Sequence, residues 1–431
     1  MVEVAFITLG CPKNEVDTAA MKARVAASRY ELSEDPRSAD VVVVNTCSFI
    51  TSAAEASIET ILDIAGEHSG RLLVAGCLVN RYTAEQLSAE LPEVDAFIAI
   101  EGEADILRVI EELTGEARGQ QDSAACEVGA SAYLMIADGC DRACSYCTIP
   151  AIRGPYRSKR PDELVAEARR LLAAGARELV LIAQDTTAYG HDLDGRHSLA
   201  SLLTQLCDQC GAPWLRLMYL QPEGISDELI EVIARHPQIV RSLEIPLQHS
   251  SEQILRAMRR AGGRRQFTKL IARLRDRLGE VALRTTLIAG FPGETEADFE
   301  DMVEFVGEIG FDYVGVFSFS PEDGTVAAAL PDQIDPVVAL RRAQLLRDRA
   351  DEIGWKKAAA HVGETTCVLI ERYDEEEGCW FGRAPFQAPD IDGQVRIAAD
   401  AGDDLIATIR PVLIQDALLY DLEGVIRDES A

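Results

Sequence analysis

The chain has 431 residues, 47% of them hydrophobic and 26% charged, a size and composition typical of a globular protein with about three domains. Its formal net charge of −30 argues against a large nucleic-acid interface and favours a basic partner. No apolar stretch approaches the roughly 18 to 20 residues of a membrane span, and no basic-then-apolar leader precedes the first strand pattern. We therefore expect a cytoplasmic protein that does not enter the membrane.

Short β-branched runs alternate with helical patterns in the first part of the chain. The runs occupy residues 2–9, 41–45, 71–76 and 96–100. Such runs predict a parallel sheet with helices on both faces, and therefore a Rossmann-like α/β domain over residues 1–115. Residues 116–131 have no periodicity, which predicts a linker.

A second and longer series of strand and helix patterns follows the linker. Its six strand patterns lie at residues 133–138, 178–185, 214–220, 242–248, 281–291 and 312–320. Six such units predict a partial (β/α)6 TIM-like barrel over residues 132–360, with one long helix at 334–360. From residue 361 to 431 short strands separated by Gly and Asp predict a small OB-like β-barrel.

Three cysteines after the first strand of this series supply an unusual set of metal ligands. Cys140, Cys144 and Cys147, here called the loop triad, have Cys-x3-Cys-x2-Cys spacing and no fourth cysteine beside them. A 4Fe-4S cluster held by three thiolates leaves one iron open to a small molecule, whereas clusters that only carry electrons are usually closed by four. A structural zinc site is the alternative, but it needs four ligands. The spacing therefore favours a catalytic cluster.

Three further cysteines stand where predicted strands end. Cys11, Cys47 and Cys77, here called the amino-terminal triad, each follow one of the first runs. Because carboxyl ends of neighbouring parallel strands share one edge of a sheet, these thiols could converge there and hold a second cluster. The alternative is three buried cysteines that act as small hydrophobic side chains. Three nearby amides are candidate hydrogen-bond donors to cluster sulfur: Asn14, Asn45 and Asn80.

These motifs together resemble the radical S-adenosylmethionine methylthiotransferase family. The resemblance rests on LGCPKN, NTC and GC around the amino-terminal triad, on CDRACSYCTIPAIRG around the loop triad, and on GFPGET at 290–295. It covers essentially the whole chain and identifies the carboxyl-terminal barrel as a TRAM domain. The segments at 183–190, 388–393 and 416–424 resemble the branch of the family that modifies a ribosomal protein.

The resemblance implies two 4Fe-4S clusters and S-adenosylmethionine as cofactors. The loop triad would ligate the radical cluster, and the amino-terminal triad would ligate an auxiliary cluster that holds the sulfur. The implied reaction is methylthiolation at the β-carbon of an aspartate in small-subunit ribosomal protein number twelve. An unactivated carbon–hydrogen bond cannot be deprotonated by a side chain, so this replacement calls for a radical supplied by the cofactor. An electron donor such as a flavodoxin or a ferredoxin would be needed.

Other residues are weaker candidates for binding the cofactor. Tyr146 precedes the last cysteine of the loop triad, as in related enzymes. Arg153 could reach the cofactor carboxylate, but it belongs to a basic run, and such runs are usually solvated loops. The remaining candidates lie where strands of the barrel end. The structural alternatives for these are solvated strand ends or an ordinary turn. The strand-end candidates are Gln184, Asp185, Gly290, Pro292, Gly293 and Glu294.

Several other residues are expected to have structural roles. His249, beside Gln248, follows the fourth strand pattern of the barrel, where a lone histidine is more often structural than catalytic. Cys207 and Cys210 form a CDQC segment inside a helical pattern with no partner motif, so a redox or metal role is disfavoured. No role is assigned to three further cysteines: Cys126, Cys367 and Cys379.

Charge distinguishes between ribosomal protein and tRNA as the substrate. Residues 361–431 contain 16 Asp or Glu, 5 Arg and no Lys, a net charge of −11. An RNA-binding barrel normally presents basic residues to phosphates, so this tail favours a basic ribosomal protein and makes tRNA unlikely. A tRNA-adenosine methylthiotransferase is the alternative, and a non-enzymatic iron-sulfur carrier is disfavoured because the open three-cysteine pattern occurs twice.

Overall fold

The computed structural model describes residues 2–117, 128–398 and 405–427. Two compact units make up the chain, and each contains segments that are far apart in sequence. The first comprises Met1–Glu127, Asp138–Arg157 and Glu322–Thr325, and the second comprises Val128–Ala137, Ser158–Pro321 and Val326–Ala431. No helix in the described ranges is long and apolar enough to cross a membrane. Cys126 and most of the expected linker lie outside the described residues.

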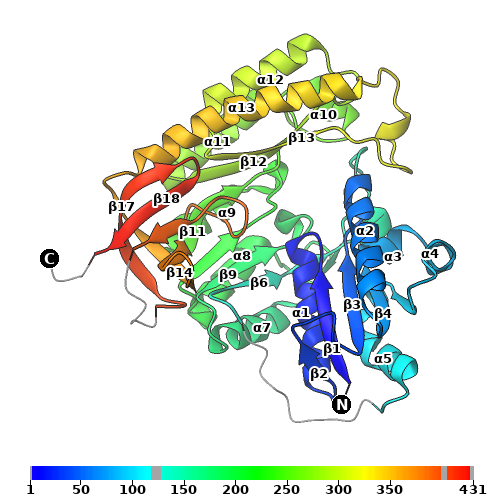
Figure 1. The fold of residues 1–431 in the computed structure, drawn as a ribbon. Helices are drawn as coiled ribbons and strands as arrows, with labels where there is room; N and C mark the ends of the chain where they lie inside the picture. Colours follow the sequence, from blue (N-terminus) through cyan, green and yellow to red (C-terminus); the bar gives the residue numbers. More distant parts are fainter. Residues whose placement is uncertain (1, 118–127, 399–404, 428–431) are drawn as a thin grey trace. The chain divides into compact units, whose positions relative to one another are not determined.

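The first unit contains a five-stranded parallel sheet of strand order β2-β1-β3-β4-β5 (Figure 1). Its strands are β1 (Glu3–Thr8), β2 (Glu31–Ser33), β3 (Val41–Thr46), β4 (Arg71–Gly76) and β5 (Ala96–Ile98). Its helices are α1 (Pro12–Ala26), α2 (Thr51–Glu67), α3 (Cys77–Arg81), α4 (Ala84–Glu90), η1 (Ile100–Asp105), α5 (Ile106–Thr114) and α6 (Ile149–Arg153). The sequence pattern did not predict the short edge strand β2.

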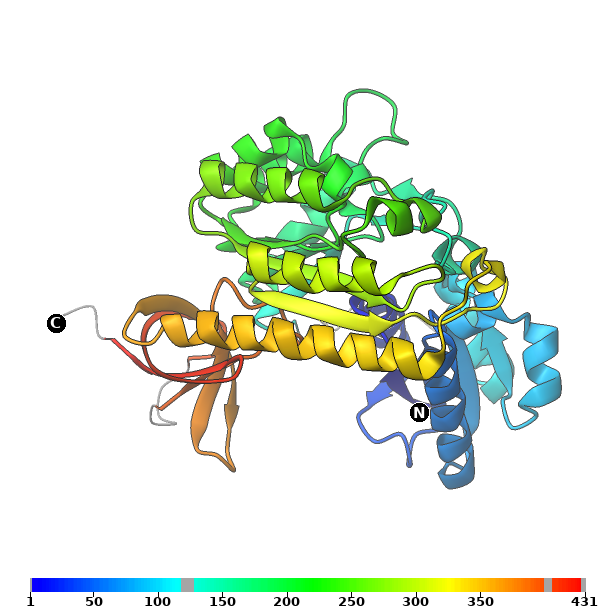
Figure 2. The same cartoon turned by 90° about the horizontal axis from the view of Figure 1, so that it is seen from above.

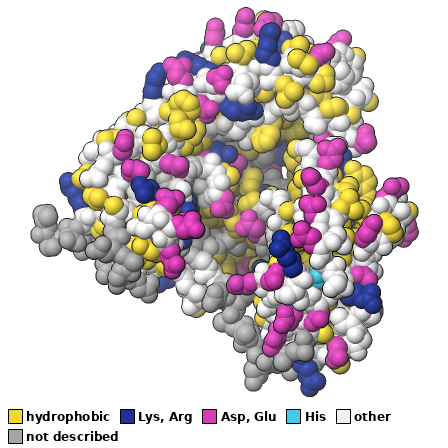
Figure 3. Space-filling model, viewed as in Figure 1, with side chains coloured by type: hydrophobic (Ala, Val, Ile, Leu, Met, Phe, Trp, Pro, Cys, Tyr) yellow, Lys and Arg dark blue, Asp and Glu magenta, His cyan; other side chains and the backbone are white. Residues whose placement is uncertain are grey.

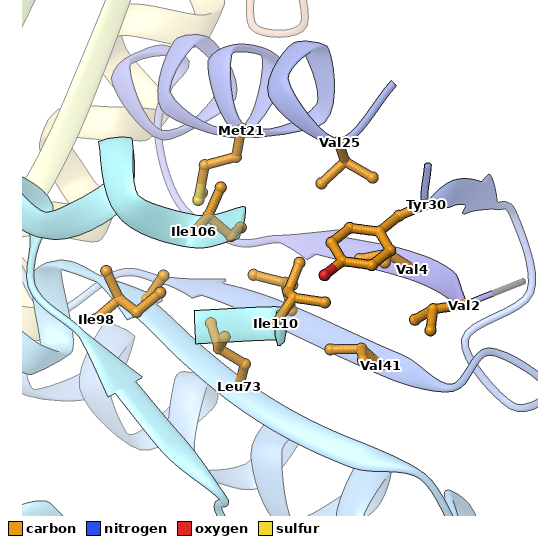
Figure 4. Packing of buried hydrophobic residues seen from close by; sticks show 12 residues of the cluster. Val2, Val4, Met21, Val25, Tyr30, Val41, Leu73, Ile98, Ile106 and Ile110 are labelled. Atoms are coloured by element: carbon orange, nitrogen blue, oxygen red, sulfur yellow. The ribbon is translucent and has the colours of Figure 1, made fainter. Parts of the chain in front are cut away.

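Alternate residues of β3 build two hydrophobic cores, one on each face of this sheet. Val41 and Val43 belong to one cluster with Met21 of α1 and with Ile106 and Ile110 of α5, and Figure 4 shows Met21 beside Ile106 and Val41 near Ile110. Val42 and Val44 pack on the opposite face with helices α2, α3 and α4. All four valines are fully buried, which explains why this strand reads as a continuous apolar run. The Rossmann-like prediction is confirmed.

The second unit contains an open six-stranded parallel sheet of order β13-β12-β11-β10-β9-β6. Its strands are β6 (Ser131–Met135), β9 (Glu178–Ile182), β10 (Trp214–Leu217), β11 (Ile239–Glu244), β12 (Ala282–Ala289) and β13 (Tyr313–Ser318). Its helices are α7 (Pro161–Ala173), α8 (Leu199–Cys210), α9 (Asp227–Arg235), α10 (Glu252–Ala257), α11 (Arg264–Leu278) and α12 (Glu296–Ile309), with short turns η2 (Thr186–Ala188), η3 (Pro222–Gly224) and η4 (Ala327–Ala329). The chain passes between the two units within β7 (Ala137–Asp138) and β8 (Arg157–Ser158). This open sheet confirms the partial (β/α)6 barrel.

Two elements of this unit correspond to predicted ones but have different bounds. The strand expected at 242–248 is β11, which begins earlier and ends at Glu244 because Pro246 lacks the N–H that a continuing ladder needs. The expected long helix is α13 (Pro336–Ala360), whose N-cap Asp335 accepts a hydrogen bond from the Val337 N–H at 2.8 Å. Figure 2 shows α13 lying along the edge strand β13.

The carboxyl-terminal strands close into a five-stranded barrel. They are β14 (Thr365–Asp374), β15 (Cys379–Arg383), β16 (Val395–Ile397), β17 (Ile409–Leu418) and β18 (Asp421–Ile426), in the order β14-β15-β16-β18-β17. Trp380 and Phe381 are buried, and Tyr373 packs against Trp380 with ring centroids 4.9 Å apart. These aromatic side chains therefore contribute to the packing of the barrel. The predicted small barrel is confirmed.

A buried ionic joint connects this barrel to the amino ends of the parallel strands. Glu178, the first residue of β9, accepts hydrogen bonds from Arg216 at 2.7 Å and from Arg383 of the barrel at 2.5 Å. Burial alone would raise the pKa of Glu178, but Arg216 and Arg383 outweigh burial and lower it to about 2. A second pair joins Arg284 of β12 to the buried Asp392. The barrel is thus attached at the amino end of this sheet, opposite to the strand ends that are followed by Gln184 and Gly290.

Candidate functional site

The amino-terminal triad lies at the carboxyl edge of the first sheet. Cys11 is the N-cap of α1 after β1, Cys47 directly follows β3, and Cys77 begins α3 after β4. The strands β1, β3 and β4 are adjacent, and Thr46 pairs with Gly76 at their ends. The topology therefore brings the three thiols to one edge, as the sequence predicted.

Two glycines allow the strand-end turns to pack closely. Gly10 has φ +101°, and a Cβ at this position would lie 2.6 Å from the Cβ and 2.9 Å from the Sγ of Cys47. Gly76 has φ +89°, and a Cβ there would overlap Asn45 Oδ1. Both positions combine a left-handed conformation with no room for a side chain, so only glycine fits. The close packing of Cys47 against the turn of Cys11 depends on this.

The expectation that asparagine amides donate to cluster sulfur is wrong for Asn14 and Asn45. Asn14 Nδ2 donates to the carbonyl oxygens of Leu9 and Thr46, at 2.7 and 2.8 Å. Asn45 Nδ2 donates at 3.0 Å both to the Asn14 carbonyl and to a threonine hydroxyl. Asn80 Nδ2 donates to a glutamate carboxylate at 3.1 Å. These amides hold the strand-end turns together because main-chain carbonyls there need donors.

The loop triad belongs to the same compact unit as the amino-terminal triad. Its three cysteines lie between residues 138 and 157, in a loop followed by α6. The Cys147 N–H donates to the Cys144 carbonyl at 3.2 Å, and the Cys140 N–H donates to the Gly154 carbonyl at 3.1 Å. The second of these bonds closes the base of the loop. Tyr146 is half-buried within it, and its predicted role in binding the cofactor stays a prediction.

Two side chains attach this loop to the first sheet. Thr148 Oγ1 donates to the Phe49 carbonyl at 2.8 Å. Arg153, which is 2% exposed, donates through one terminal nitrogen to Asn14 Oδ1 and Asp17 Oδ2, both at 2.8 Å. The same nitrogen lies 3.9 Å from Cys77 Sγ. The predicted contact of Arg153 with the cofactor carboxylate stays a prediction, and its observed partners are all in the first unit.

The charged groups beside Cys77 form a buried cluster. Arg153 also donates to Asp138 at 3.3 Å, and Glu103 lies close enough to Asp17 to interact with it electrostatically. Burial raises the pKa of Glu103, with Asp17 adding to the effect, to about 8. Glu103 Oε1 has no hydrogen-bond partner among the described residues. The sequence analysis missed Asp17, Asp138 and Glu103, since no local pattern distinguishes them from other acidic residues.

Burial also governs the amino-terminal thiols. It raises the pKa of Cys77 to about 12, while the positive charge of Arg153 acts in the opposite direction. Burial likewise raises the pKa of Cys47. Iron ligation requires thiolates, so the positive charge of Arg153 favours the form of Cys77 that binds metal.

The number of thiols in each cysteine triad suits a 4Fe-4S cluster. Each triad offers three thiols and no fourth ligand, which is the donor set of a 4Fe-4S cluster with an open iron. Over residues 2–117, 128–398 and 405–427, no three His, Cys, Asp or Glu side chains are arranged to hold one metal ion.

The strand-end candidates belong to the second unit and are largely engaged with their own turns. Asp185 caps η2, accepting from the Ala188 N–H at 3.2 Å, while Gln184 beside it is half-buried. Glu294 is buried and accepts from the Gly290 N–H at 2.9 Å, so it ties together the two ends of the segment that includes Pro292 and Gly293. Their role in binding the cofactor stays a prediction.

The contacts of His249 agree with the structural interpretation. It is fully buried, and its Nδ1 accepts from the Ser251 N–H at 2.9 Å. Nε2 therefore carries the proton and donates to Glu294 Oε2 at 3.2 Å. Arg342 of α13 pairs with the other carboxylate oxygen at 2.7 Å. These contacts fix Glu294.

The CDQC segment carries no sign of a site. Cys207 and Cys210 lie in the last turn of α8, and burial raises the pKa of Cys207 to about 12. Cys210 Sγ lies 3.9 Å from the Val165 carbonyl of the neighbouring helix. A buried thiol with a raised pKa is unreactive, which agrees with the structural interpretation.

Comparisons with known proteins agree with this architecture. Three family profiles match in succession: Uncharacterized protein family UPF0004 at residues 3–99, the Radical SAM superfamily at 134–306, and the TRAM domain at 362–426. Each match lies inside one of the domains expected from the sequence, whose limits remain predictions.

Curated relatives match almost from end to end. The ribosomal protein uS12 methylthiotransferase RimO of Geobacter sulfurreducens is 44% identical, with 98% of each chain covered. The RimO of Anaeromyxobacter sp. strain Fw109-5 is 46% identical over 97% of this chain and 91% of its own. The chain belongs to the RimO family. It is therefore a radical S-adenosylmethionine methylthiotransferase, with S-adenosylmethionine and 4Fe-4S clusters as cofactors.

Solved structures share the fold at low sequence identity. The radical S-adenosylmethionine methyltransferase TsrM from Kitasatospora setae, solved with cobalamin and a 4Fe-4S cluster, has a TM-score of 0.55. It is 14% identical, and the match covers 84% of this chain and 79% of TsrM. At this identity the likeness concerns the fold alone.

Proposed function

We propose that this enzyme methylthiolates the β-carbon of an aspartate in ribosomal protein uS12. In this proposal the loop triad ligates the radical cluster, and the amino-terminal triad ligates an auxiliary cluster that holds the transferred sulfur. The observation that carries the proposal is the presence of both triads in one compact unit, joined through Thr148 and Arg153. The curated relatives are named for uS12, which supports the choice of substrate.

The residues of the chain contribute binding, orientation and charge. When bound, the clusters and S-adenosylmethionine supply the radical and the sulfur that the reaction needs. Three thiolates from each triad would hold a cluster. The strand-end turns closed by Gly10 and Gly76 fix the positions of the amino-terminal thiols, and Arg153 holds the loop triad against the same edge. A substrate carbon must meet both groups, so this shared framework is what the chemistry requires.

The surface charge supports a basic protein over tRNA as the substrate. Acidic side chains are spread over the visible face of the molecule (Figure 3), and residues 361–431 carry a net charge of −11. The acidic turn Asp374–Glu377 joins β14 to β15, and three of its four residues are exposed. Phosphates would be repelled by such a surface, whereas a basic ribosomal protein complements it.

Iron content and product analysis of two triad variants test the cluster assignments. Anaerobically reconstituted enzyme should contain about eight irons, and changing all three cysteines of either triad to Ala should leave about half. The loop-triad variant should lose cleavage of S-adenosylmethionine. The amino-terminal variant should still cleave it to deoxyadenosine but form no methylthiolated product. Cleavage by the first variant, or normal product formation by the second, would contradict the corresponding assignment.

Mass spectrometry tests the substrate. Ribosomal proteins and tRNA from a strain lacking the gene should show loss of the methylthio group from uS12 and unchanged tRNA. Loss from tRNA instead would favour the tRNA-adenosine reaction.

A further inference from the structure

Arg153 connects the segment that carries the loop triad to Cys77 of the amino-terminal triad. It lies six residues after Cys147, at the end of α6, yet its guanidinium reaches the strand-end turns of the first sheet. One terminal nitrogen contacts Asn14 Oδ1 and Asp17 Oδ2 at 2.8 Å and lies 3.9 Å from Cys77 Sγ. The positive charge therefore sits beside a thiol that is assigned to the auxiliary cluster.

The surroundings hold this charge in place. The Arg153 side chain is 1% exposed, and the carboxylates of Asp17 and Asp138 bind two different terminal nitrogens. A guanidinium stays protonated in proteins, and the two carboxylates favour this charged form. A guanidinium offers five donors in a fixed plane, which suits several acceptors around one buried position better than an ammonium does. Charge and orientation are both fixed.

We propose that Arg153 is a positioning residue that raises the reduction potential of the cluster ligated by Cys77. This rests on the proposed function, because it requires the amino-terminal triad to hold that cluster. Reduction adds one negative charge to a cluster, and a fixed positive charge beside a ligating sulfur stabilises that state in a low-dielectric setting. Asp17 has the opposite sign and opposes this effect.

The alternative is that Arg153 only holds the loop against the sheet. Both roles predict lower stability when Arg153 is removed, so stability alone does not separate them. The sign of the electrostatic effect does. Loss of the positive charge must lower the potential, whereas loss of the neighbouring negative charge on Asp17 must raise it. A loosened structure has no reason to move the potential in opposite directions for the two changes.

The measurement is a redox titration followed by electron paramagnetic resonance, in full-length protein with the loop triad changed to Ala. In this background only the cluster of the amino-terminal triad is present. Arg153→Gln should shift its midpoint potential downward, Asp17→Asn should shift it upward, and Arg153→Lys should stay closer to the parent. Arg157→Gln is the matched control, because Arg157 belongs to the same basic run and is exposed, and it should leave the potential unchanged.

The outcomes separate the inference from the proposed function. A bound cluster whose potential is unchanged in Arg153→Gln, or moves in the same direction in Asp17→Asn, overturns the role of Arg153 alone. Absence of any cluster from the background protein overturns the assignment of the amino-terminal triad together with this inference. If Arg153→Gln does not fold, Asp17→Asn still decides, since only an upward shift agrees with the proposal.

Discussion

Two buried glutamates, one in each compact unit, show opposite electrostatics. Glu178 accepts from two arginines at the joint between the second sheet and the carboxyl-terminal barrel, which lowers its pKa to about 2. Glu103 is buried beside Asp17, and burial raises the pKa of Glu103 to about 8. The single guanidinium of Arg153 already pairs with two carboxylates, those of Asp17 and Asp138. The joint balances its own charges. The charges near the amino-terminal triad are not balanced in this way, and such local imbalance is typical of functional sites.

Removing Arg383 should have the largest effect, because it leaves the buried Glu178 with one of its two arginine partners. Arg383→Met should destabilise the second unit by about 3–5 kcal/mol, the usual result of breaking a buried ion pair. Denaturant unfolding of the reconstituted enzyme measures this. Arg372→Met is the control, since Arg372 is exposed and pairs with Asp374 at the surface. A loss of about 0.5 kcal/mol or less for Arg383→Met would show that the joint is not structural.

Acid should weaken the same joint. The pKa of Glu178 is lower in the folded protein than in the unfolded chain. The ionised Glu178 therefore stabilises the folded protein fully when the pH is above the ordinary pKa of a glutamate. This stabilisation should be lost as the pH falls from about 4.5 toward about 2. Unfolding free energies across this range should fall less steeply in Glu178→Gln than in the parent. Equal slopes would contradict the lowered pKa.

Glu103 should show the opposite dependence on pH. The pKa of Glu103 is raised in the folded protein. Its favourable contribution to the free energy of unfolding is therefore present when the pH is below the ordinary pKa of a glutamate, and it is lost as the pH rises toward about 8. Glu103→Gln should therefore be more stable than the parent at pH 8 by about 1–3 kcal/mol, and similar to it near pH 4.5. Unfolding of the cluster-free protein measures this, with the exposed Glu90→Gln as control. A variant that is less stable at both pH values would contradict the raised pKa.

Exposed carboxylates should have the smallest effect on stability. Asp374, Glu375, Glu376 and Glu377 form a surface turn, whereas Asp403 and Asp404 lie outside the described residues. Exchanging Glu375, Glu376 and Glu377 for Lys should change the unfolding free energy by only about 0.5 kcal/mol and should weaken binding to uS12. The loss should shrink as salt rises, because screening acts over about 8 Å at physiological ionic strength. A pull-down across a salt series tests this, and unchanged affinity would leave the turn with no role in recruitment.

Local patterns in the sequence predicted much of the fold and the cysteines of the site. The valine run at 41–45 indicated a strand buried on both faces, and the cysteines after three strands indicated a shared edge. One strand ends before Pro246, earlier than its pattern predicted. The strand β2 has only three residues, too few for an alternating pattern to be recognised. The asparagine amides were misjudged because nothing local shows which main-chain carbonyls lack a donor.

The sequence by itself determined the two cysteine triads, the two parallel sheets, the small barrel and the acidic tail. Each of these depends on residue type and on spacing along the chain. Only the tertiary structure decided what surrounds the thiols. Arg153 meets Asp17 across 136 positions, and Arg383 meets Glu178 across 205. A charged residue in a basic run looks the same in sequence whether it is solvated or buried. Its partner is chosen by packing between distant segments, and that packing fixes where the charge acts.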